Sequence, residues 1–406
     1  MKILFFHEDC KTMGGSNIYR KELSLALKSL GHEVYLYTME SNSDEAERCY
    51  HYTFRRGNVL VSHFKHRYFN PSFFLAFKRV LKKINPDIIH IHSNNLFPNS
   101  VLLACGNIPV VQTLHDWKMV CPIWSGMTVN GTKCEKGFSS SCYREGCISR
   151  GRYYSQSVWR KFNILLFKRH VDALITPCMA LKRTLRNYGL KSIHIPNFTC
   201  TSIFLPSPPS TNGRRILCAC HLFPSKGVTY LLRAFQNVLA RIPSARLDIV
   251  GEGPEKKSLE ELCIFLKIQN LVKFCGEVSH IELADFYSKA SVVVLPSVVA
   301  ETCGLVILEA MASARPVIGS RIGGIPEVIL ENETGLLFNP GDTSELSEKI
   351  VQILLNPERA ERMGKLGRER VEKEFSAQKH IERILDLYSS LLKAKKKEKL
   401  SNRSLL

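Results

Sequence analysis

The sequence predicts an α/β protein with two doubly wound halves. Short apolar runs that are typical of buried parallel strands alternate with helical patterns along the chain. At 406 residues, 45% of them hydrophobic, the chain is long enough for two separate cores. A stretch rich in Pro, Ser and Thr separates the halves and lacks any such pattern. We therefore predict domains at residues 1–198 and 214–375, a linker at 199–213, and a helix with a basic tail at 376–406.

The elements of the first half follow from these patterns. An apolar strand at residues 2–6 leads into a loop with Gly14 and Gly15, and a helix with apolar side chains at helical spacing runs from about Ser16 to Gly31. Further strands are predicted at 34–38, 87–92, 109–115, 173–176 and 192–196. An insertion at 117–150 contains four cysteines, for which zinc, disulfides and free thiols all stay open, free thiols being favoured. They are Cys121, Cys134, Cys142 and Cys147.

The second half repeats the alternation of strand and helix. Strands are predicted at 215–220, 245–250, 272–276 and 291–295, and helices at 227–241, 256–267, 281–290 and 304–314. Two long helices, at 357–375 and 376–394, close the chain. Because ligands of open parallel sheets bind beyond the carboxyl ends of the strands, residues at those ends are the candidates for a functional site.

Glu301 and Glu309 straddle the junction between the strand at 291–295 and an apolar helix. A carboxylate on such a helix needs a partner, because an unpaired buried charge is costly. A polyhydroxyl ligand would supply that partner, and so would a basic residue on a neighbouring helix. Gly304 permits close backbone approach, and the start of the helix suits a phosphate. The pair therefore indicates a ligand site, with a merely solvated Glu301 as the alternative.

Other strand ends supply further candidates. His115 ends one strand of the first half, and His7, His90 and His92 occupy similar ends. Each has an alternative interpretation as a structural turn or a satisfied polar group. The loops after the remaining strands contribute Gly14, Gly15, His221, Lys226, Glu252 and Val278.

Residues 291–342, with seven residues between Glu301 and Glu309, closely resemble the donor-sugar region of glycosyltransferase family 4, the group 1 glycosyltransferases. The resemblance is most specific over residues 247–342 and moderate over the first 40 residues and over 86–117. It implies a GT-B fold, in which two Rossmann-like domains face a central cleft and the final helix returns to the first domain. It also implies transfer of a sugar from a nucleotide diphosphate with retention of anomeric configuration.

The resemblance implies a role for each candidate. Glu301 would hold sugar hydroxyls, His115 would contact the transferred sugar, and Lys226 would bind the diphosphate, so these three are the expected catalytic residues. Glu309 would bind the ribose hydroxyls. No metal or other cofactor is expected. The expected donor-binding residues are Gly14, Gly15, His221, Lys226, Glu252, Val278, Cys303, Gly304, Leu305 and Glu309.

Three positions depart from the usual pattern of the family. His221 stands where Arg is usual, Cys303 where an aromatic residue is usual, and Phe198 where Gly is common. Because a histidine lacks the permanent charge and the forked geometry of Arg, leaving-group stabilisation is expected to be weaker or to depend on pH.

The net charge of +19 is concentrated in the first half. Residues 1–200 hold 28 Lys and Arg against 13 Asp and Glu, and residues 51–83 combine basic and aromatic side chains with no acidic one. This composition predicts contact with an anionic membrane, against the alternative of a helix with its aromatic side chains in the core. No nucleic-acid module is recognised, so nucleic acid is not an expected partner.

No apolar run reaches the roughly 18 residues that span a bilayer, and no signal-peptide pattern is present, so we expect a cytoplasmic protein on the inner face of the cell membrane. The expected function is retaining transfer of a hexose from UDP or GDP to a lipid-linked or polysaccharide acceptor in bacterial surface-polysaccharide synthesis. Its partners would be the nucleotide-sugar donor, a glycolipid or saccharide acceptor, and the anionic membrane. The alternatives are a transferase with a small acceptor, a nucleotide-sugar 2-epimerase of the same fold, and an inactive GT-B protein that binds membranes or partners.

Overall fold

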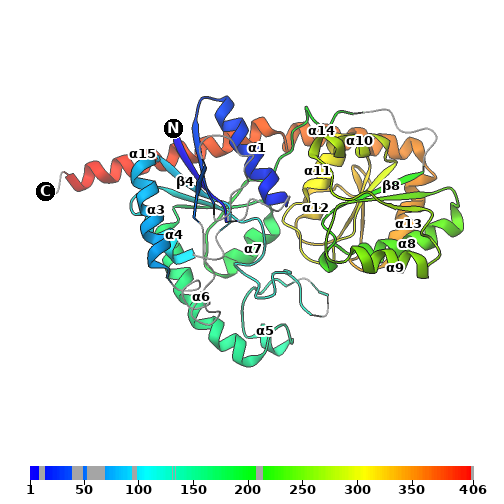
Figure 1. Cartoon of the computed structure of the whole chain (residues 1–406), viewed down its shortest axis with the longest axis horizontal. Coiled ribbons are helices and arrows are strands. Elements are labelled where there is room, and N and C mark those ends of the chain that lie inside the picture. Colours follow the sequence, from blue (N-terminus) through cyan, green and yellow to red (C-terminus); the bar gives the residue numbers. More distant parts are fainter. Residues whose placement is uncertain are drawn as a thin grey trace.

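A computed structural model describes residues 1–8, 14–38, 49–52, 69–93, 98–129, 131–132, 134–206 and 214–403. They form two lobes that lie side by side, each with a central sheet flanked by helices (Figure 1). The predicted division into two doubly wound halves is confirmed.

The first lobe contains a parallel sheet in the order β3-β2-β1-β4-β5-β6-β7. The order reverses beside β1, which creates a switch point where a ligand can bind beyond the strand ends. The strands are β1 Lys2–Phe6, β2 Glu33–Thr38, β3 Cys49–His51, β4 Ile88–Ile91, β5 Val110–Thr113, β6 Ala173–Thr176 and β7 Ile193–His194. The helices are α1 Gly15–Ser29, α3 Pro71–Ile84, α4 Pro98–Cys105, α5 Ser141–Arg144, α6 Arg150–His170 and α7 Met179–Asn187.

The second lobe repeats this plan with the order β10-β9-β8-β11-β12-β13, again all parallel. Its strands are β8 Arg215–Ala219, β9 Arg246–Val250, β10 Val272–Phe274, β11 Val292–Leu295, β12 Val317–Ser320 and β13 Gly335–Phe338. Its helices are the 3-10 turn η1 Pro224–Lys226, then α8 Val228–Arg241, α9 Lys256–Phe265, α10 His280–Lys289, α11 Leu305–Ala312, α12 Ile325–Val328, α13 Thr343–Leu354 and α14 Pro357–Glu374.

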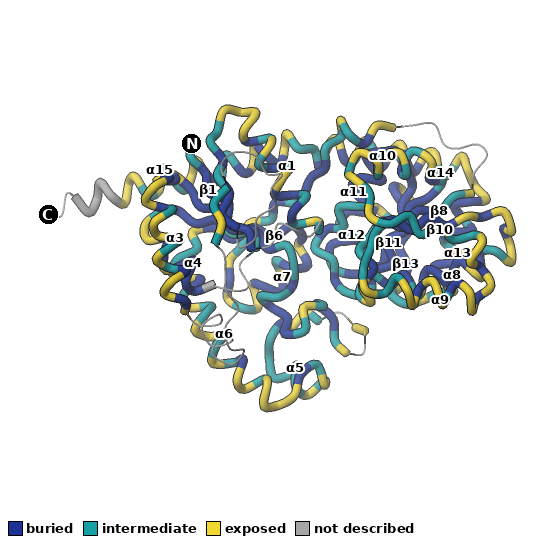
Figure 2. Tube along the Cα trace, viewed as in Figure 1, coloured by how far each residue is buried: buried dark blue, intermediate teal, exposed yellow. Residues whose placement is uncertain are grey.

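The helix that carries Glu309, α11, is the most enclosed of the second lobe's helices that border the site. Every residue from Ile307 to Ala312 is buried, and Gly367 of α14 lies against Met311. The strands inside each lobe are mostly dark, which marks the buried sheets (Figure 2). Beyond its first turn the helix has no solvated face, because the second lobe packs around it, so its one carboxylate is held away from bulk water.

The final helix α15, Ala377–Arg403, leaves the second lobe and lies along the first (Figure 1). Ile384 and Tyr388 are fully buried in a cluster with Phe5 and Tyr19 of the first lobe. The Tyr388 hydroxyl lies 2.6 Å from Nδ1 of His90. The predicted return of the last helix is therefore confirmed.

The segment that joins the lobes differs from the predicted linker at 199–213. The Thr199 amide donates to the carbonyl of Phe375 at 3.2 Å, and Phe204 is fully buried. The Phe204 ring meets the ring of His280 edge-on, so this part of the segment already belongs to the second lobe. Residues 207–213 lie outside the described part of the chain.

None of the helices described is both long enough and apolar enough to cross a membrane.

Candidate active site

A cleft of about 390 Å³ lies between the lobes, at the carboxyl ends of both sheets. Two of the predicted site residues do not line it. Gly14 precedes α1 as its N-terminal cap, and the thiol of Cys303 packs in the core, where burial raises its pKa. The predicted residues that do line the cleft are Gly15, His115, His221, Lys226, Glu252, Val278, Glu301, Gly304, Leu305 and Glu309.

Lys226 and Glu301 meet on the floor of this cleft. The Lys226 ammonium donates to Oε1 of Glu301 at 2.6 Å, and the Ser297 hydroxyl donates to the same oxygen at 2.7 Å. Burial favours the neutral form of both groups, but their mutual attraction outweighs it, so the pKa of Lys226 is raised and the pKa of Glu301 is lowered. A cation and an anion therefore face the cleft together.

The loops that carry this pair pack tightly against each other. Gly227, just after Lys226, has φ of 68°, and a Cβ there would meet the carbonyl oxygen of Pro296 at 2.1 Å. The amide of Val298 donates to the carbonyl of Ser225 at 2.9 Å. Only glycine allows this approach, which holds the loop after β8 against the loop after β11.

Glu309 is held by two side chains of the neighbouring helix α10. His280 Nε2 donates to its Oε1 at 3.1 Å, and the Tyr287 hydroxyl donates to its Oε2 at 2.8 Å. The alternative of a basic partner on a neighbouring helix therefore applies, although Glu309 also lines the cleft. Across the cleft, Oε1 of Glu22 on α1 lies 3.6 Å from His280 Nδ1.

This arrangement shifts two pKa values upward. Burial opposes a charged His280, but the hydrogen bond and charge of Glu309 outweigh it and raise the pKa of the imidazole. Burial raises the pKa of Glu22 from 4.5 to about 7, against the attraction of His280. His280 thus links the carboxylates of both lobes.

His115 follows β5 and, among the histidines of the first lobe that the structure describes, is the one that lines the cleft. Its carbonyl accepts a hydrogen bond from the Thr302 hydroxyl at 3.0 Å, which joins the lobes. Burial lowers the pKa of His115 to about 3, so its ring is neutral at physiological pH. His7, His90 and His92 are buried behind it.

The N-terminus of α11 forms the other polar surface of the cleft. Gly304, Leu305 and Val306 line it there, and amides of a first helical turn lack partners within the helix. The partial positive charge of this end suits a phosphate. His221 lines the cleft as well, in the loop after β8.

Several cleft residues were not predicted from the sequence. Asp116, Asn197, Glu277, His280 and Thr302 line it as well. Glu22, which contacts His280, does not line the cleft itself, but it lies one helical turn after Ile18, which does. Helical spacing therefore places Glu22 on the side of α1 that faces the cleft. The contact between Glu22 and His280 could not be predicted from the sequence, because it depends on how the two lobes are positioned relative to each other.

The four cysteines of the insertion are free thiols, with Cys121 and Cys142 buried and Cys134 and Cys147 half-buried. Burial raises the pKa of Cys134 and Cys142. Among the residues that the structure describes, no three or more His, Cys, Asp or Glu side chains are arranged to hold a metal ion.

Comparisons with known proteins found relatives in sequence and in fold. N-acetyl-alpha-D-glucosaminyl L-malate synthase of Bacillus anthracis is 26% identical over 402 residues, which cover 96% of this chain and 97% of that protein. Sulfoquinovosyl transferase of Arabidopsis thaliana is 40% identical over 150 residues, 36% of this chain, but the match spans only 28% of its length. The solved structure of HepE from Anabaena with UDP-glucose has a TM-score of 0.75 at 17% identity, over 96% of this chain and 100% of that one, and so shows a shared fold.

Two family models match consecutive parts of the chain. The model described as Glycosyltransferase Family 4 matches residues 13–202, and the model described as Glycosyl transferases group 1 matches residues 203–370. Both lobes are therefore accounted for, and the chain belongs to the group 1 glycosyltransferases of family 4, with the GT-B fold.

Proposed function

We propose that the chain transfers a hexose from UDP or GDP to a lipid-linked or polysaccharide acceptor, with retention, in bacterial cell-surface polysaccharide synthesis. The observation that carries this proposal is the convergence of Lys226, Glu301, Glu309 and the α11 N-terminus on one cleft. A cation, a helix N-terminus and two carboxylates suit a ligand that carries a diphosphate between a sugar and a ribose.

Each part of the donor has a matching surface in the cleft. Lys226, Gly15 and the first amides of α11 would hold the diphosphate, with His221 beside them. Glu309 would accept hydrogen bonds from the ribose hydroxyls. Because His280 and Tyr287 already fix its carboxylate, Glu309 would bind without a change of side-chain rotamer. The loops with Glu252 and Val278 would frame the base.

In the transfer step, the acceptor oxygen would bond to the anomeric carbon on the face from which the diphosphate leaves. The bond from that carbon to the phosphate oxygen breaks, and the acceptor proton passes to the departing diphosphate. Lys226, charged at neutral pH, would stabilise the negative charge that develops there. Glu301 would hold sugar hydroxyls, and no residue would form a covalent bond to the sugar.

The proposed membrane contact is supported by an exposed apolar stripe on α6. Val158 is 75% exposed and Leu165 65% exposed, and Tyr154 and Phe162 lie on the same side of the helix. Basic side chains flank the stripe, and α6 contains no acidic residue. An amphipathic helix of this kind favours the surface of an anionic bilayer.

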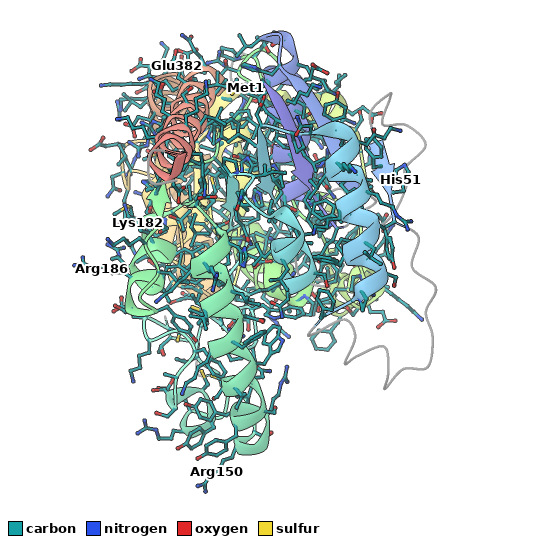
Figure 3. All side chains as sticks on the ribbon, turned by 90° about the vertical axis from the view of Figure 1, so that its left-hand side faces the viewer. Met1, His51, Arg150, Lys182, Arg186 and Glu382 are labelled. Carbon is teal, nitrogen blue, oxygen red and sulfur yellow. The ribbon has the colours of Figure 1, made fainter. Side chains whose placement is uncertain are left out.

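Helix α3 extends the same surface. It packs on α4, which packs on α6, and the three helices lie on one face of the first lobe, with Arg150 at the start of α6 (Figure 3). Lys78, Arg79, Lys82 and Lys83 of α3 are exposed, and α3 also lacks acidic residues. Each basic residue near an anionic leaflet contributes about 1 kcal/mol. Of the predicted basic segment at 51–83, residues 53–68 lie outside the described part of the chain.

A small acceptor is the second candidate, because the Bacillus anthracis relative that matches nearly the whole chain is named N-acetyl-alpha-D-glucosaminyl L-malate synthase, a name that joins a sugar to a small hydroxy acid. It would need the same donor site but no bilayer contact. The two functions are distinguished by the acceptor that gives a product: a membrane lipid extract for the first, a small hydroxy acid for the second.

The test is turnover of UDP-glucose and GDP-mannose with a membrane lipid extract as the acceptor source, followed by NMR of the new glycosidic bond. We expect an α linkage from either donor. A β linkage would exclude retention, and a C2-epimerised nucleotide sugar formed without acceptor would favour the epimerase. Failure of both donors, with and without acceptor, would favour a protein that only binds.

A further inference from the structure

His115 has a different neighbour on each side of its ring. Its Nε2 lies 3.4 Å from Nδ1 of His92, and the two rings are stacked with centroids 5.6 Å apart and 27° between their planes. No described residue hydrogen-bonds its Nδ1. Because His115 lines the cleft, Nδ1 is the ring nitrogen left for a ligand.

His92, unlike His115, is buried away from solvent. It is 3% exposed, and its second nitrogen, Nε2, is buried without a hydrogen-bond partner. Burial lowers the pKa of both histidines, that of His115 to about 3. Each ring is therefore neutral at physiological pH and has one N–H group and one bare nitrogen.

Two arrangements of the hydrogens satisfy the contact between the rings. In one, His92 Nδ1–H donates to a bare Nε2 of His115, and the buried Nε2 of His92 is a bare lone pair. In the other, His115 Nε2–H donates to His92, which forces the hydrogen of His92 onto its buried Nε2. Both arrangements leave Nε2 of His92 without a partner, but an orphaned buried N–H is less well tolerated in proteins than an under-satisfied acceptor, so the second arrangement is the more costly one.

We propose that His92 is a positioning residue that holds His115 in the tautomer with hydrogen on Nδ1, so that His115 presents an N–H donor to the cleft. What this donor meets rests on the proposed function: an oxygen of the transferred sugar, which accepts the hydrogen bond. A neutral donor at this point would select sugars with a hydroxyl or carbonyl oxygen there and disfavour an ammonium group.

The tautomer can be measured without any turnover. In protein labelled with ¹⁵N-histidine, long-range ¹H–¹⁵N correlation spectra distinguish the two tautomers, and His115→Gln identifies the His115 signals by their loss. We expect the Nδ1–H form in the wild type. A wild type with His115 in the Nε2–H form would overturn the proposal, whatever donor the enzyme uses.

Two substitutions at position 92 supply a matched comparison. The amide N–H of Asn stands close to the position of His Nδ1, so His92→Asn should keep the Nδ1–H form of His115, whereas His92→Leu should lose it. With UDP-glucose or GDP-mannose hydrolysis as the second readout, kcat/KM should fall about tenfold in His92→Leu and recover in His92→Asn, as for one net hydrogen bond. Melting curves check that both variants fold. An unchanged His115 tautomer in folded His92→Leu would overturn the positioning role.

Discussion

Lys226 and Glu301 compensate each other's buried charge, so substituting one of them should affect both activity and stability. Lys226→Met should lower donor kcat/KM by about 10²–10³-fold, as for loss of an electrostatic group at the leaving oxygen. It should also destabilise the fold by about 1–3 kcal/mol, because Glu301 stays buried without its cation. Urea unfolding and donor turnover measure the two effects.

The double variant Lys226→Met with Glu301→Gln is the matched control. Removing both charges should restore most of the stability and none of the activity, because neither group is then left unpaired. A double variant as unstable as Lys226→Met would show that the pair is not the cause of the loss.

Glu22 should make the stability of the folded protein depend on pH. Its pKa is about 7 in the folded protein and 4.5 in an ordinary environment, so between these values the folded state keeps a proton that the unfolded chain has released. The stability from this group therefore falls as pH rises from 4.5 to 7. The melting temperature of the wild type relative to Glu22→Gln should decrease over that window, while exposed Glu358→Gln should show no such change.

The sequence was sufficient to predict site residues that are identified by their position within one local segment. The spacing of Glu301 and Glu309, together with the strand ends at His115 and Lys226, is enough to indicate a ligand site between the two halves. His280 could not be predicted in the same way, because its role depends on contacts with Glu309 from α11 and with Glu22 from the other lobe. Contacts between residues far apart in the chain produce no regular spacing in the sequence from which they could be predicted.

At the scale of single elements, the start of α11 depends on its glycine. Gly304 has φ of 76°, and a Cβ there would lie 2.8 Å from Cδ2 of Leu295. Gly304→Ala should therefore cost about 1 kcal/mol of stability and weaken donor binding, since the first turn of α11 would shift.

Gly14→Ala is the matched control, because Gly14 has φ of −79° and a Cβ there meets nothing within 4 Å. Its stability should change by less than about 0.5 kcal/mol. Urea unfolding of both variants tests the comparison, and equal destabilisation would contradict it.

Helix α6 should control membrane contact. Val158→Glu with Leu165→Glu should weaken co-sedimentation with phosphatidylglycerol vesicles about tenfold or more, because charges replace the most exposed apolar side chains of α6. Ile264→Glu with Phe265→Glu, on α9 of the second lobe, removes equally exposed apolar side chains and should change little. Equal losses in both double variants would contradict a docking surface on the first lobe.

The basic and aromatic composition at 51–83 identified α3 but not α6. In α3, Phe73 and Phe77 lie in the core, so the basic side chains of this helix and not those two aromatic ones are available to a bilayer. In α6, the apolar side chains face outward, and periodicity alone does not reveal which face of a helix meets the lobe. The tertiary packing decides this.

For the whole molecule, the sequence predicted two doubly wound sheets and the return of the last helix, because both follow from repeated local patterns and the family resemblance. The closeness of the lobes could not be predicted. It rests on a few contacts across the cleft, such as the Glu327 carboxylate, which accepts from the amides of Met179 and Ala180 at 2.7 Å. This carboxylate caps α7 from the opposite lobe, so the lobes are coupled through helix ends.

The central claim is that the second lobe binds a nucleoside diphosphate through Lys226 and the start of α11. Thermal melting of the wild type and of Lys226→Met with UDP and with GDP tests it most directly. Because a ligand stabilises the state that binds it, one of the two nucleotides should raise the wild-type melting temperature by a few degrees at saturation and have little effect on Lys226→Met. Melting temperatures that neither nucleotide changes, or that rise equally in both proteins, would contradict the claim.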